Sequence, residues 1–342
     1  MIELTSRRLG VDAAVAADYE AFHDGAAVVD LSDRGRMRFH GNGAKDALNG
    51  LLTCDVAPLT NGHGAYGVAL TSKGKVIADV SVFAMDESFL VEVPRAVWSA
   101  WKDLVAKFVN PRLSKRTDET ELTCEIGIFG PRAADIIAEM TGSEVIPLEE
   151  LPMYAHVTLA MESVIVNVAR IPDFGVDGYR LLAVRDAFDQ LRDRTIALGG
   201  RIVGAAAIEA ARIEAGRPLW GVDMDDSTLP QEANLEALNA ISYTKGCYTG
   251  QEIVARLHFR GHVNKRVVGL RVDGSAVPSR GTPVLGPDAN EVGEIRSSIL
   301  SPRFGPIALA MIRREVNVGD SVAFSIDGAD TRATVSALPF NA

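Results

Sequence analysis

The first 262 residues show two periods in their hydrophobic and polar positions. Apolar residues recur at helical spacing in some stretches and alternate with polar residues in others, which separates amphipathic helices from half-buried strands. The pattern predicts helices at residues 11–22, 44–52, 95–109, 131–140, 185–198 and 205–215. It predicts strands at residues 27–31, 36–40, 67–70, 76–83, 89–93, 125–129, 163–169 and 179–184. Hairpins that alternate with helices are typical of an α+β fold with antiparallel sheets.

The pattern changes near residue 263, where helical periodicity ends. Six short strands separated by turns follow, at residues 267–272, 282–285, 294–297, 307–312, 321–326 and 331–335. Closely spaced short strands indicate a small barrel or sandwich. We therefore expect an N-terminal α+β region at 1–145, a second α+β region at 146–262 that is intertwined with the first, and a C-terminal β-barrel at 263–342.

Composition narrows the class of protein. The chain has 342 residues, of which 47% are hydrophobic and 23% are charged, as expected for a globular protein of two or three domains. Its formal net charge of −10 argues against general nucleic-acid binding through phosphate neutralisation. No signal-like start and no apolar run of about 20 residues is present, so we expect neither export nor membrane insertion.

The three cysteines, Cys54, Cys124 and Cys247, are far apart and form no Cys-x-x-Cys pair. Neither a disulfide framework nor a local thiolate metal site is indicated, and a cytoplasmic protein fits best. His258 and His262 have the spacing of a helical metal pair, but no further ligand accompanies them. We expect surface histidines and no metal site.

The run Lys245 to Glu252, KGCYTGQE, is the strongest candidate for chemistry. Thr249 and Glu252 have the spacing of a capping box, which predicts a helix from there towards Gly261. Cys247 would then lie just before the helix, where the dipole and the neighbouring Lys245 favour a thiolate. The candidate catalytic residues are Cys247, Lys245, Gln251 and Glu252. The competing interpretation is an inert buried cysteine, which is the common state of a free thiol.

The same run resembles the signature of the YgfZ-type folate-binding proteins, which are relatives of the glycine-cleavage T-protein (aminomethyltransferase). The resemblance extends along the chain in short matching segments at residues 30–32, 41–44, 55–56, 130–131, 212–216, 301–302 and 338–340. It implies a three-domain cloverleaf around a central folate pocket. It also implies tetrahydrofolate as cofactor, iron–sulfur client or assembly proteins as partners, and an indirect role in tRNA modification.

The resemblance also implies which residues bind folate: Asp79, Asp177, Tyr179 and Arg212. Tyr66, which opens a strand, is a further candidate because it could stack on a pterin or simply pack. Two positions depart from the T-protein pattern. The hairpin that carries an acid pair in T-proteins has Ala78 followed by Asp79, and the pterin-binding Glu position is occupied by Val176, next to Asp177. Each candidate also has an ordinary structural interpretation, such as a solvent-facing strand acid for Asp79 or a helix-surface arginine for Arg212.

Three functions follow from these residues. The leading hypothesis is a tetrahydrofolate-binding accessory factor for iron–sulfur protein assembly or repair, which acts through the Cys247 thiolate. The second is a folate-dependent aminomethyltransferase of the T-protein type, although the loss of one acid at Ala78 removes a group that could manage a proton at the folate. The third is a scaffold without folate and without catalysis.

Overall fold

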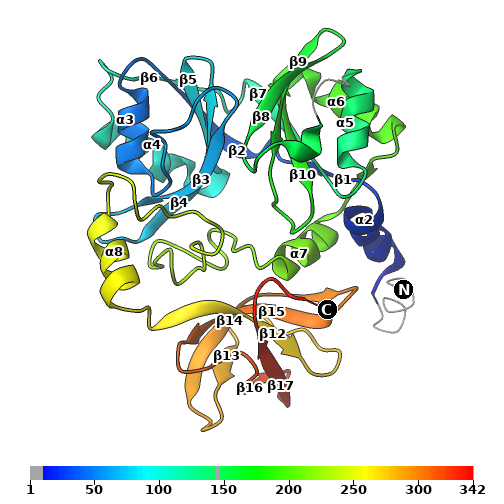
Figure 1. Cartoon of the computed structure of the whole chain (residues 1–342). Coiled ribbons are helices and arrows are strands. Elements are labelled where there is room, and N and C mark those ends of the chain that lie inside the picture. Colours follow the sequence, from blue (N-terminus) through cyan, green and yellow to red (C-terminus); the bar gives the residue numbers. More distant parts are fainter. Residues whose placement is uncertain (1–10, 143–146, 342) are drawn as a thin grey trace.

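The computed structural model describes residues 11–142 and 147–341, which form two sheet domains side by side above a small barrel (Figure 1). The first domain is an antiparallel sheet with the order β3-β4-β5-β2-β6. Its strands are β2 (Arg34–His40), β3 (Gly64–Leu70), β4 (Val76–Met85), β5 (Ser88–Pro94) and β6 (Lys115–Asp118). Helices α3 (Ala44–Leu51) and α4 (Trp98–Phe108) cover it, and the 3-10 turn η1 (Arg95–Val97) precedes α4. The buried stripe of α4 has the spacing that an amphipathic helix requires and consists of Trp98, Trp101, Leu104 and Val105.

The second domain is built on a six-stranded sheet with the order β11-β1-β7-β10-β9-β8. Its strands are β1 (Ala27–Asp30), β7 (Thr123–Phe129), β8 (His156–Met161), β9 (Val164–Arg170), β10 (Gly178–Val184) and β11 (Arg201–Ile202). Its helices are α2 (Ala13–Asp24), α5 (Ala133–Thr141), α6 (Phe188–Ala197) and α7 (Ala205–Glu214), with the 3-10 turns η2 (Leu148–Glu150) and η3 (Arg185–Ala187). Strands from both sides of residue 145 therefore pair in one sheet.

The C-terminal strands close into a six-stranded barrel with the order β12-β15-β14-β13-β16-β17. They are β12 (Lys265–Val272), β13 (Pro283–Leu285), β14 (Glu291–Ser301), β15 (Gly305–Arg313), β16 (Ser321–Ile326) and β17 (Ala329–Ser336). Helix α8 (Gln251–Arg260) leads into the barrel. The predicted α+β architecture with antiparallel sheets and a C-terminal barrel is confirmed.

A buried network of charges joins the two sheet domains. Arg36 of β2 donates to Glu92 of β5 at 2.8 Å and to Glu125 of β7 at 3.0 Å. Arg180 of β10 donates to the same Glu92 at 3.2 Å and also pairs with Asp173. Burial alone would raise the pKa of Glu92, but Arg36 and Arg180 outweigh it and lower that pKa. The network places charges from both sheets at the domain interface, next to the loop that contains Asp173.

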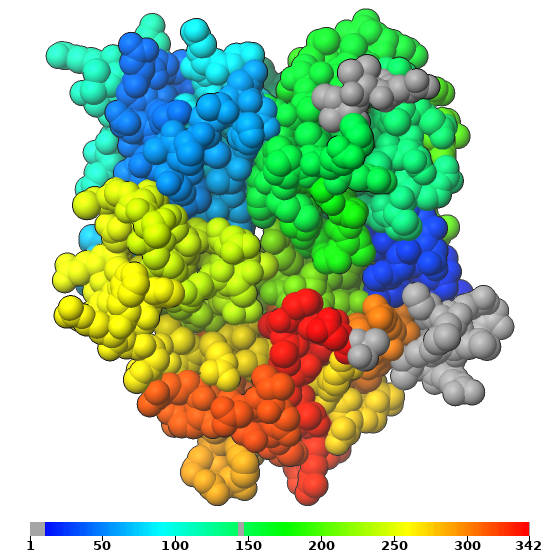
Figure 2. Space-filling model, viewed as in Figure 1, coloured from blue at the N-terminus to red at the C-terminus, as the bar shows by residue number. Residues whose placement is uncertain are grey.

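The segment between α7 and α8, residues 215–250, has no regular helix or strand and runs through the centre of the molecule (Figure 1). It bonds to the first sheet through Val76 N–H and Thr228 O at 2.9 Å, and to the barrel through Val267 N–H and Glu232 O at 2.8 Å. The space-filling view shows this segment packed between the sheet domains and the barrel (Figure 2). The segment therefore contacts the two sheet domains and the barrel and holds them around one central space.

Candidate functional site

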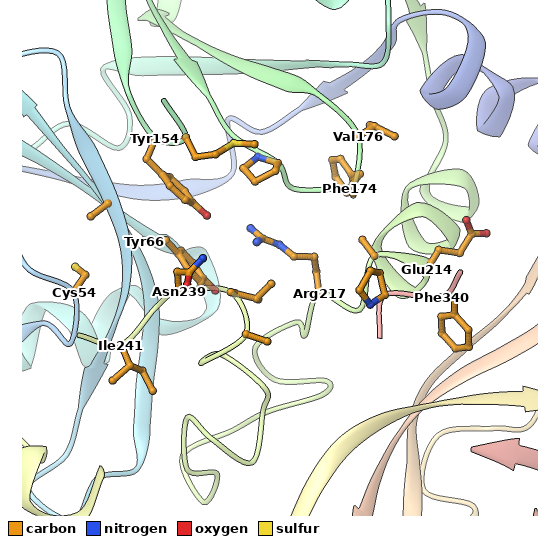
Figure 3. Close-up of a pocket in the computed structure, with 18 of the residues that line it drawn as sticks. Cys54, Tyr66, Tyr154, Phe174, Val176, Glu214, Arg217, Asn239, Ile241 and Phe340 are labelled. Carbon is orange, nitrogen blue, oxygen red and sulfur yellow. The ribbon is translucent and has the colours of Figure 1, made fainter. Parts of the chain in front are cut away.

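A cavity of about 790 Å³ lies at this centre, where the two sheet domains meet the barrel (Figure 3). Its volume is within the range of small-molecule and cofactor sites. Five aromatic side chains line it, from both sheet domains, the barrel and the C-terminal segment: Tyr66, Tyr154, Phe174, Phe304 and Phe340. Among the predicted folate-binding residues, Tyr66 is the one in the cavity lining.

Tyr66 and Tyr154 form one end of the cavity with Arg217. The two phenol rings are stacked, with centroids 5.9 Å apart and planes 8° apart. The Arg217 guanidinium lies 5.3 Å from the Tyr66 ring centroid and pairs with Asp173 at 2.9 Å. In Figure 3 it points from the middle of the cavity towards the tyrosines. A flat heterocycle finds aromatic faces and a fixed cation at this end.

Asp79 lies behind Tyr66 on β4. The Tyr66 hydroxyl donates to Oδ2 of Asp79 at 3.3 Å, while Oδ1 is buried and has no hydrogen-bond partner in the described parts of the chain. The strand alternates as its sequence predicts, with Ala78 fully buried and Asp79 on the opposite face. The single remaining acid of the hairpin is therefore connected to the cavity wall through a tyrosine.

Asp177 and Tyr179 lie outside the residues that line the cavity. The Asp177 side chain is 55% exposed and pairs with Arg170 at 2.6 Å. Tyr179 is buried in the core of the second sheet. Val176 lines the cavity at the position where the T-protein pattern has Glu. The structure thus puts a hydrophobic side chain, and not the neighbouring acid, at this wall.

Arg212 is buried on α7 and fully engaged by protein groups. It pairs with Glu209 and donates to Asp223 at 2.7 Å and to the carbonyl of Arg217 at 2.6 Å. Its guanidinium therefore fixes the segment that follows α7, from which Arg217 reaches the cavity. Arg212 was predicted to bind folate, but all three of its guanidinium nitrogens already donate to protein groups and it does not line the cavity.

The other end of the cavity lies at α7 and the barrel. Glu214 lines it and accepts hydrogen bonds from Tyr19 Oη and Ser301 Oγ, each at 2.6 Å. Burial raises the pKa of Glu214, and these two hydrogen bonds oppose that effect. Arg303 also lines the cavity, is exposed, and has no ion pair among the residues that the structure describes.

The Cys247 motif folds differently from the predicted capping box. Helix α8 starts at Gln251, its N-cap residue is Gly250 with φ of 83°, and no side chain caps it within the described chain. The predicted bonds of Thr249 and Glu252 are therefore wrong. This position requires glycine, because its φ is in the left-handed region and a Cβ would lie 2.6 Å from the carbonyl oxygen of Thr71. Cys247 is exposed. A reactive thiol needs this exposure, whereas an inert core cysteine is buried.

Lys245 is buried and points into the protein. Its ammonium donates to the carbonyl oxygens of Asn49 at 2.6 Å, Leu52 at 2.9 Å and Cys54 at 2.6 Å. Burial lowers the pKa of Lys245. Lys245 was predicted to stabilise the Cys247 thiolate. All three of its N–H donors instead bind carbonyl oxygens at the end of α3 and in the turn after it.

Sequence reasoning missed Tyr154, Phe174 and Arg217. Tyr154 has a positive φ of 64°, an uncommon conformation for a tyrosine, in the loop before β8. Arg217 follows Gly216, which ends α7 with φ of 67° and redirects the chain into the cavity. The available signal for Arg217 was a cation directly after a helix-ending glycine in an irregular, polar stretch.

Within residues 11–142 and 147–341, no group of three or more His, Cys, Asp or Glu side chains could hold a metal ion. His258 pairs with Glu236 at 2.8 Å and stacks on Tyr243, while His262 is exposed. The same residues include no helix with the length and apolar character that a bilayer span requires.

Comparison with known proteins identifies the class. The GCVT N-terminal domain matches residues 6–242, and the glycine cleavage T-protein C-terminal barrel domain matches residues 265–341. Since these matches cover most of the sequence, the chain belongs to the glycine cleavage T-protein family. This confirms the superfamily that the sequence resembles, and it does not distinguish the YgfZ-type branch within it.

Similar proteins extend over nearly the full chain. The aminomethyltransferases of Synechococcus sp. (strain WH7803) and Saccharopolyspora erythraea are each 29% identical to it, over 95% of this chain and 90% and 89% of theirs. The crystal structure of glycine cleavage system aminomethyltransferase T from Bartonella henselae superposes with a TM-score of 0.85 at 21% identity. It covers 96% of this chain and 89% of that one, so the two share a fold.

Proposed function

We propose that this protein binds tetrahydrofolate in the central cavity and uses it in one-carbon transfer. The aromatic end of the cavity carries the proposal, because Tyr66, Tyr154 and Arg217 provide π faces and a fixed cation for a pterin-like heterocycle. Bound tetrahydrofolate would supply nitrogen atoms that carry a one-carbon unit. The cavity volume of about 790 Å³ accommodates a ligand of that size.

Aminomethyl transfer is the activity that family membership favours. The similar proteins over 95% of the chain are named aminomethyltransferases. Asp79 is the residue of this chain that suits the reaction, since its buried Oδ1 has no partner in the described residues and its Oδ2 accepts a hydrogen bond from Tyr66 of the cavity lining. The absence of a second acid at Ala78 leaves this role to one carboxylate.

Calorimetry with 5-formyltetrahydrofolate, followed by an assay of methylenetetrahydrofolate formation from an aminomethyl donor, tests the proposal. We expect saturable binding at micromolar concentration and turnover that depends on Asp79. Absence of folate binding would refute the proposal as a whole. Binding without turnover in the presence of a competent donor would refute the transferase step.

A second candidate is a folate-binding factor for iron–sulfur protein assembly or repair that acts through Cys247. Two observations favour it: Cys247 is exposed, and it lies in the KGCYTGQE run. An exposed thiol can exchange with a client cysteine or bind iron or sulfide for a short time. Iron–sulfur client or assembly proteins would be the partners, and the three separated cysteines suit a reducing cytoplasm.

The two candidates differ in what Cys247→Ala does. In cells that lack the native gene, the second candidate predicts that the wild-type chain restores iron–sulfur enzyme activities and that Cys247→Ala does not. Cys124→Ala is the matched control, because Cys124 is buried in the core of the second sheet and does not line the cavity. Full rescue by Cys247→Ala would remove the thiol from the mechanism.

A further inference from the structure

Part of the cavity wall and the exposed Cys247 belong to the same irregular segment of the chain, which hydrogen bonds hold in place. Asn239, Ile241 and Ser242 line the cavity, and Cys247 follows five residues after Ser242. In this irregular stretch, position is set by bonds to neighbouring segments. Figure 3 shows Asn239 and Ile241 on the same side of the cavity as Cys54.

Residues 49–54 provide those bonds. Thr53 Oγ1 donates to the carbonyl of Ala240 at 2.6 Å, and the Ser242 N–H donates to the carbonyl of Thr53 at 2.9 Å. Further along, the Thr249 N–H donates to the carbonyl of Gly50 at 3.0 Å. Lys245 lies between these contacts and adds three more through its ammonium group.

The Lys245 ammonium is suited to hold this junction. Asn49 and Leu52 are at the C-terminal end of α3, where carbonyl oxygens lack helical partners and the helix dipole attracts a cation. The third acceptor is the carbonyl of Cys54, whose own side chain lines the cavity. Three donors meet three acceptors, and the bonds are charge-assisted.

We infer that Lys245 links the occupancy of the cavity to the order of the Cys247 loop, residues 243–250. A ligand that contacts Cys54, Ile241 and Ser242 restrains both segments that Lys245 joins. Because the two segments are restrained, the conformational entropy of the loop decreases, and the loop becomes more ordered without a change of fold. Lys245 acts here as a positioning residue, and this inference rests on the proposed folate binding for its ligand.

Hydrogen exchange read by mass spectrometry tests the link, with 5-formyltetrahydrofolate as the probe and its affinity measured by calorimetry. In the wild-type protein we expect saturating probe to slow exchange in residues 243–250 by about threefold or more. Residues 243–250 do not line the cavity, so slower exchange there shows that the effect of the bound probe reaches the loop. Probe that binds without slowing exchange in this loop would overturn the inference.

The variant Lys245→Met removes the ammonium and keeps a long side chain. Without probe, we expect exchange to become about tenfold faster both in residues 243–250 and in residues 52–56, because both sides of the junction lose their partner. With probe, the protection of the loop should disappear while the Kd changes less than about threefold. Lys73→Met, in an exposed turn, is the control and should change neither segment.

The measurements with and without probe test the folate proposal and the Lys245 link separately. If the probe does not bind, the folate proposal fails, and the probe-free comparison of Lys245→Met with Lys73→Met still decides whether Lys245 joins the wall to the loop. If Lys245→Met accelerates exchange only in residues 243–250, the link to the cavity wall is wrong. The wild-type comparison with and without probe needs no variant and decides the case even if Lys245→Met does not fold.

Discussion

The Tyr66 hydroxyl donates a hydrogen bond of 3.3 Å to Oδ2 of Asp79. This contact connects the cavity lining to the one acid that the β3–β4 hairpin retains from the T-protein pattern. Asp79 does not itself line the central cavity, so Tyr66 separates its carboxylate from the cavity space. The contact makes the tyrosine and the acid a single functional unit whose parts can be tested separately.

Asp79→Asn keeps the volume of the side chain and removes its charge. We expect folate-dependent transfer to slow about 100-fold, which is typical for loss of a general acid or base, with a Kd for 5-formyltetrahydrofolate within about threefold of wild type. Steady-state kinetics and calorimetry give the two values. Asp177→Asn is the matched control, since Asp177 is exposed and paired with Arg170, and equal damage by both variants would contradict the role of Asp79.

Tyr66→Ala removes an aromatic face from the cavity. We expect folate affinity to fall about tenfold, which corresponds to about 1.4 kcal/mol and to the usual value of an aromatic contact. Calorimetry measures the change. Tyr179→Phe should leave the affinity unchanged because Tyr179 is in the core of the second sheet. An unaltered Kd in Tyr66→Ala would place the ligand elsewhere.

Glu92→Gln breaks the buried charge network between the two sheet domains. Arg36 and Arg180 would lose their shared carboxylate but keep Glu125 and Asp173, so we expect the unfolding free energy to fall by about 1.5–3 kcal/mol, the usual value of a hydrogen bond to a charged group. Urea unfolding measures the loss. Asp189→Asn is the control on the surface, where solvent screens its pair with Arg192 and we expect little change in stability. Similar small effects in both variants would show that the network does not stabilise the interface.

Acid should destabilise the protein through Asp173. Burial alone raises the pKa of this carboxyl, but Arg180 and Arg217 outweigh it and hold the pKa below the ordinary 3.8. A carboxyl whose pKa is lower in the folded state contributes stability above its unfolded pKa and loses it as pH falls through the folded pKa. Urea unfolding between about pH 6 and about pH 3 should show a decline below about pH 4 that is shallower in Asp173→Asn. An equal decline in both proteins would exclude this carboxyl as a source.

Thr249→Ala and Gly250→Ala distinguish the predicted helix start from the observed one. A capping threonine would contribute about 1 kcal/mol, but Thr249 makes no such bond, so we expect Thr249→Ala to change the unfolding free energy by less than about 0.5 kcal/mol. Gly250→Ala should cost about 1–3 kcal/mol because of its φ of 83° and the nearby Thr71 carbonyl. Urea unfolding of both variants is the measurement, and the reverse order would restore the capping box.

Local sequence pattern identified the elements that bury one face. Burial alternates as predicted over residues 76–80, although residues 81–83 are all buried, and the strands after residue 263 close into a barrel. The pattern missed β6 and β8 because they are edge strands: β6 is largely exposed, and β8 alternates only in part. An edge strand is held by backbone hydrogen bonds to its one neighbour. The pattern of its side chains therefore indicates little about where the strand lies.

The sequence by itself determined the α+β class, the C-terminal barrel and the T-protein resemblance, and it named Tyr66 as a candidate, which the structure places in the cavity lining. The tertiary structure alone decided that Arg212 fixes a loop, that Lys245 binds three carbonyls, and that Tyr154 and Arg217 meet Tyr66. Periodicity reports which face of an element is buried, but not which distant segment covers it. The central cavity lies between two sheet domains and a barrel, so its lining depends on contacts between residues that are far apart in the sequence.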